Sequence, residues 1–129
     1  MRQGLRTGLA ALLLAAPAPL AAESLDCLMQ HHCMTGDGCA DLAEAAAMRL
    51  ELAADRASGR LGVGEVQMEL RLLARHERGD TFLAEAPGGG SIGVLTLAPD
   101  GRFLTSSHEF GMEPILVTAG TGTCTPRNG

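Results

Sequence analysis

The chain has 129 residues, of which fifteen are acidic and ten basic, so its formal net charge is −5 at neutral pH. All ten basic residues are arginine, and the aromatic residues are three phenylalanines, with no tryptophan or tyrosine. This length fits one small domain, and the acidic charge and scarce aromatic rings argue against a basic or base-stacking nucleic-acid surface.

Residues 1–22 have the pattern of a secretory signal peptide. Arg2 and Arg6 form a positive region, a mainly apolar stretch covers residues 5–16, and Leu20-Ala21-Ala22 offers a cleavage site with small residues at its end. This apolar run is shorter than the roughly 20 residues needed to span a bilayer. We therefore expect an exported protein, periplasmic or secreted, that does not span the membrane.

Four cysteines follow the expected cleavage site: Cys27, Cys33, Cys39 and Cys124. An even number of cysteines in an exported chain favours two disulfides, which can be paired in three ways. If the fold is a closed antiparallel sheet, its first and last elements lie together. On that basis we expect Cys27 to pair with Cys124 and Cys33 to pair with Cys39 in a local loop.

Residues 23–41 are rich in cysteine and look irregular, with turn-forming residues at 35–38. The alanine-rich run at 42–47 favours a helix by propensity. From Met48 onward apolar and polar residues alternate, which indicates a strand at about 47–55. We expect a short helix or an irregular lead-in before this strand, and the sequence leaves the choice open.

Alternation continues after a turn expected at 57–60. The positions of the apolar residues shift between Val63 and Val66, and a β-bulge at Gly64-Glu65 would explain the shift. A helix over 65–77 is the alternative, but it fits the apolar pattern less well.

Glycine- and proline-containing turns separate the later apolar runs, and Pro-Asp-Gly at 99–101 is a strong hairpin signal. The spacing predicts six or seven short strands in a small antiparallel β-barrel or sandwich, held by disulfides. This single all-β domain would span residues 23–124 and be followed by a polar tail at 125–129.

One segment has the composition of a metal site. Met29, His31, His32 and Met34 lie within six residues and offer soft sulfur and imidazole ligands suited to copper or zinc. Adjacent histidines in an extended chain point to opposite faces, and an oxidised Cys33 has no thiolate to offer. Solvated loop histidines are therefore the simpler interpretation.

Ser107-His108-Glu109 has the residue types of a hydrolase, but neighbours in a strand alternate faces and cannot converge as a triad. We expect no enzymatic activity.

The cysteine pattern resembles a group of small exported alphaproteobacterial proteins of unknown function. Cys27, Cys33 and Cys39 match their C-x5-C-x5-C spacing, residues 122–124 match their terminal Gly-x-Cys strand, and the hairpin at 95–102 is also similar. The layout is more distantly similar to periplasmic β-barrel lysozyme inhibitors, which are disulfide-stapled binders. The loop motif of those inhibitors has no clear match in this chain.

The leading hypothesis is therefore a non-enzymatic, disulfide-stabilised binding or inhibitor-like β-domain, with an unidentified protein or envelope ligand as its partner. The alternative, from a different class, is a periplasmic copper- or zinc-handling protein that uses the Met29–Met34 segment.

Overall fold

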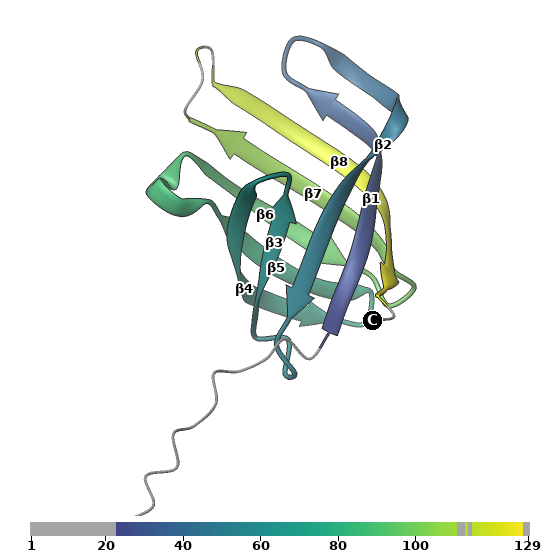
Figure 1. Cartoon of the computed structure of the whole chain (residues 1–129). Coiled ribbons are helices and arrows are strands. Elements are labelled where there is room, and N and C mark those ends of the chain that lie inside the picture. Colours follow the sequence, from purple (N-terminus) through teal and green to yellow (C-terminus); the bar gives the residue numbers. More distant parts are fainter. Residues whose placement is uncertain (1–22, 111–112, 114, 128–129) are drawn as a thin grey trace, which may run out of the picture.

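The computed structural model describes residues 23–110, 113 and 115–127, and the expected signal peptide lies outside this range. The described chain forms a closed antiparallel barrel of eight strands in sequence order, in which the first strand pairs with both the second and the last (Figure 1). A short 3-10 turn, η1 (Pro87–Gly89), joins two of the strands. The strands are β1 (Glu23–Met34), β2 (Gly38–Leu52), β3 (Ser58–Val63), β4 (Val66–His76), β5 (Gly79–Glu85), β6 (Ser91–Leu97), β7 (Arg102–Glu109) and β8 (Leu116–Pro126).

The all-β prediction and the barrel are confirmed, but the expected number of six to seven strands is too low. One missed strand is β1, whose residues look irregular because a shift in pairing register beside Gln30 interrupts their alternation. The bulge expected at Gly64-Glu65 is instead the two-residue turn of a hairpin, because Val63 pairs directly with Val66. Gly64 has a φ of 59°, as the first position of a type II′ turn requires.

The helix considered at residues 42–47 is absent, and these residues belong to β2. Strand pairing with β1 overrides the helical propensity of the alanines. The pairing is irregular here, since Ala46 is opposite Met29 and Asp41 is opposite His31, which leaves four β2 residues facing Gln30. Over Gly38–Ala47, β2 has β1 as its ladder partner, whereas β3 pairs with β2 over Met48–Leu52.

The barrel is filled by its own side chains. Alternate residues of the strands point inward, and the most fully buried are Phe82, Leu50, Leu52, Leu95 and Cys27. Glycine at position 122 of β8 leaves room for its neighbours, because a Cβ there would overlap the Leu28 backbone carbonyl and lie 2.8 Å from the Phe103 ring. The interior is therefore a packed core of the kind found in small barrels.

Two disulfides join strands at directly opposed positions, and they are the pairs expected from the sequence. Cys27–Cys124 links β1 to β8 across 97 residues of sequence, at the seam where the first and last strands close the barrel. Cys33–Cys39 links β1 to β2 across six residues, next to their connecting turn. Disulfides of this kind are typical of proteins in an oxidising compartment outside the cytosol.

In the part of the chain that the structure describes, no helix has the length and apolar character needed to cross a membrane.

Candidate functional site

The outward surface of β6, β7 and β8 carries a group of exposed apolar side chains. Ile92 and Val94 are successive outward residues of β6, Leu104 lies on β7 and Val117 on β8, with exposed fractions of 37–54%. We call these four residues the outer apolar face. The register aligns Ile92 with His108 and His108 with Val117, so Ile92 and Val117 lie on either side of His108. Leu104 lies four residues earlier in β7, on the same outward side of the sheet.

His108 extends this face toward the end of β7. Its ring meets Phe110 edge to face, with ring centroids 6.3 Å apart, and Phe110 is half exposed. The neighbouring Ser107 hydroxyl shares a hydrogen bond of 2.6 Å with Thr118 and points to the other side of the sheet. Ser107, His108 and Glu109 therefore do not converge, as the alternation of strand residues predicts.

The structure does not bring the four predicted metal ligands together. The side chain of Met29 packs against the core. His31 pairs with Thr121 in β8 and lies on the outer surface. His32 pairs with Gly120 and Met34 pairs with Thr118, and these two pairs face the interior. His31 is thus separated by the sheet from the other three.

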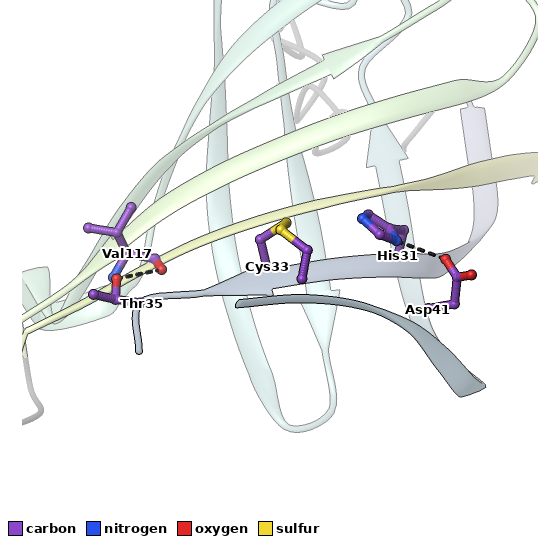
Figure 2. Close-up of a disulfide and its surroundings, with 6 residues drawn as sticks. His31, Cys33, Thr35, Asp41 and Val117 are labelled. Carbon is purple, nitrogen blue, oxygen red and sulfur yellow. Dashed lines mark hydrogen bonds and ion pairs between the residues drawn. A yellow bond between two sulfur atoms is a disulfide. The ribbon is translucent and has the colours of Figure 1, made fainter. Parts of the chain in front are cut away.

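A different set of ligand-type atoms does meet on the outer surface of β1 and β2. The Cys33–Cys39 disulfide lies beside His31, and the imidazole and the two sulfur atoms are within 4.8 Å of one another. His31 Nδ1 is 2.8 Å from an Asp41 carboxylate oxygen (Figure 2). The sequence interpretation missed Asp41, although a pairing of Cys33 with Cys39 would also place residue 31 opposite residue 41.

Charged side chains cluster at the opposite end of the barrel, where β1 and β5 begin. Arg56 donates two hydrogen bonds of 2.7 Å to the Glu23 carboxylate and one of 3.2 Å to Asp80. Asp80 is buried, and a second arginine, Arg75, lies 3.4 Å from it. The hydrogen bonds from Arg56 hold the pKa of Glu23 below its ordinary value, and Glu23 in turn raises the pKa of Arg56.

This charged cluster is structural in character. Arg56 has a φ of 55°, a left-handed conformation that is costly for a residue with a side chain. The three hydrogen bonds compensate this cost and tie the connection between β2 and β3 to the starts of two other strands. Its carboxylates are held in ion pairs.

Comparisons of the chain with protein-family models, with curated proteins and with solved structures found no match. The geometry of the two outer features, the apolar face and the disulfide beside His31, therefore carries the functional argument.

Proposed function

We propose that this protein is an exported, non-enzymatic binding module that contacts a protein partner through the outer apolar face, in the periplasm or outside the cell. The observation that carries the proposal is the exposure of Ile92, Val94, Leu104 and Val117 on the outward side of three adjacent strands, while the interior is filled. Apolar side chains that gather on a small domain's surface commonly mark a protein contact.

The filled interior supports a contact on the outside of the barrel. Small-molecule sites are concave and enclose most of the ligand, and here Phe82, Phe103 and Leu95 occupy the space inside. An inhibitor-like role fits this arrangement, because a rigid, disulfide-held sheet loses little conformational freedom on binding.

The test is site-specific photo-crosslinking in cells that produce the protein. A photoreactive residue at Ser106, which is exposed between Val94 and Ala119 on β7, is expected to give a discrete adduct. The same residue at Gln67, exposed on β4, is the control and is expected to give none. Equal labelling from both positions, or saturable substrate turnover by the purified protein, would contradict the proposal.

A second experiment measures the contribution of the face itself. The double variant Leu104→Lys/Val117→Lys is expected to lose the adduct formed at Ser106, whereas Val66→Lys on β4 is expected to keep it. Val66 and Leu104 are similarly exposed, 51% and 54%, so the control matches the chemistry and differs in position.

A further inference from the structure

The surroundings of the Cys33–Cys39 disulfide, at the end of the β1–β2 hairpin, indicate more than a structural role for it. His31 and Cys33 are two residues apart in β1 and so share one face of the sheet, and Cys39 is opposite Cys33 in β2. Their nitrogen and sulfur atoms gather within 4.8 Å. Two cysteine sulfurs and one imidazole are a common partial ligand set for zinc.

The orientation of the imidazole is the second observation. In a neutral ring, the proton on Nδ1 is donated to Asp41, which leaves the lone pair on Nε2 free. Figure 2 shows the ring between Asp41 and the disulfide, with the nitrogen not bonded to Asp41 turned toward the sulfur atoms. Histidines that bind metals commonly donate their other ring proton to a carboxylate in this way.

We propose that the Cys33–Cys39 disulfide gates a zinc site made of Cys33, Cys39 and His31. In the oxidised protein the sulfur atoms are bonded to each other and offer no thiolate. A dithiol reductant supplies two electrons and two protons, so that Cys33 and Cys39 become thiols and the reductant becomes a disulfide. Zn²⁺ then displaces both thiol protons to solvent and binds two thiolates and Nε2 of His31, with water in the fourth position.

The two disulfides differ in their access to a reductant. Cys27 and Cys124 are 2% and 7% exposed, within the core, whereas Cys39 is exposed and Cys33 half-buried at the hairpin end. Thiol–disulfide exchange requires the attacking thiolate to reach a sulfur atom. Reduction of Cys33–Cys39 is therefore expected to precede that of Cys27–Cys124.

The hairpin keeps its position when this disulfide opens. The Thr35 hydroxyl donates to the Val117 carbonyl at 3.0 Å and accepts from the Val117 amide at 2.9 Å, which ties the turn to β8 (Figure 2). Ladder pairing of Met34 with Gly38 and of His32 with Ala40 continues on both sides of the cysteines. Reduced Cys33 and Cys39 therefore stay opposite each other beside His31.

The first measurement is selective reduction of the purified protein with a phosphine, followed by alkylation and mass spectrometry. Two modified cysteines, mapped to Cys33 and Cys39, are expected. The reduced protein is then titrated with Co²⁺ under anaerobic conditions. We expect one equivalent to bind with thiolate-to-metal charge-transfer absorption and a tetrahedral ligand-field spectrum, and Zn²⁺ to displace it. The oxidised protein is expected to give neither signal.

Variants then assign the ligands. His31→Ala is expected to weaken Zn²⁺ binding by tenfold or more, and Asp41→Asn by about tenfold, as for other carboxylates that orient a metal-binding histidine. His32→Ala, on the opposite face of the same strand, is the matched control and is expected to bind like the parent protein. Far-UV circular dichroism checks that each variant is folded.

Three results would overturn the proposal. They are release of all four thiols together, absence of metal binding by the folded reduced protein, and equal binding by His31→Ala and its parent. None of these measurements involves the outer apolar face, so the outcome is independent of the proposed binding role.

Discussion

The two disulfides should differ strongly in what they contribute to stability, because they close loops of very different length. Cys27 and Cys124 are 97 positions apart and Cys33 and Cys39 are six apart. The loop-entropy relation gives about 4.7 kcal/mol for the long loop and about 2.2 kcal/mol for the short one, a difference of about 2.5 kcal/mol. Both estimates assume that the disulfide mainly restricts the unfolded chain.

The perturbation is the double variant Cys27→Ala/Cys124→Ala, compared with Cys33→Ala/Cys39→Ala. The first is expected to lose about 4.7 kcal/mol, which is about a third or more of the roughly 5–15 kcal/mol by which domains of this size are stable. Burial increases the difference between the stability losses of the two double variants. Removing the sulfur atoms of Cys27 and Cys124 also removes packing from the core, whereas Cys39 is exposed.

The assay is equilibrium unfolding in urea, followed by far-UV circular dichroism because the chain has no tryptophan or tyrosine to report by fluorescence. Linear extrapolation gives the free energy of unfolding of each variant. If the two double variants lose equal stability, or if the Cys33/Cys39 variant loses more, the reasoning from the unfolded chain is wrong for this barrel.

Three further predictions concern single positions. Arg56→Ala is expected to lower the free energy of unfolding by about 2 kcal/mol, because the charge-assisted hydrogen bonds of Arg56 are lost. Arg56→Gly is expected to lower it by about 1 kcal/mol less, because glycine tolerates the positive φ. Equal losses for the two variants in urea unfolding would exclude backbone strain at this position. Gly122→Ala is expected to cost about 1–3 kcal/mol or more, because the new Cβ would overlap the Leu28 backbone carbonyl and press on the Phe103 ring. Gly90→Ala, with open space around it, is expected to leave the thermal midpoint unchanged. Because Arg56 lowers the pKa of Glu23, the stability from this pair is fully present above the ordinary pKa of 4.5 and declines as the pH falls through the lower folded-state pKa. The free energy of unfolding should therefore fall less steeply with acid in Arg56→Gly than in the parent protein.

Residue alternation predicted the strands wherever it was undisturbed. In β2, Met48, Leu50 and Leu52 are buried and Arg49 is exposed, as the pattern from Met48 onward requires. The predicted number of strands was too low partly because the hairpin turn at Gly64-Glu65 was interpreted as a bulge. A chain reversal and a bulge both shift the alternation of apolar and polar residues by one position.

The candidate site was predictable to a smaller extent. The types of Cys33, Cys39 and His31 drew attention to the hairpin, but the metal hypothesis used sequence neighbours and combined His31 with His32 on the opposite face. The partner that matters, Asp41, is ten residues away and is found through strand register. The outer apolar face combines residues from β6, β7 and β8, and only the register between strands shows that Ile92 and Val117 lie on either side of His108.

The irregular pairing in β2 also bears on how the protein avoids aggregation. Over Gly38–Ala47, β2 is a strand with one neighbour, β1, and such an edge offers backbone hydrogen bonds to any other extended chain. Here the four extra residues opposite Gln30 interrupt the regular spacing of those groups, and Asp41 and Glu44 place negative charge along the strand. The part of β2 that extends beyond its pairing with β3 is therefore an edge strand that is poorly suited to templating fibrils.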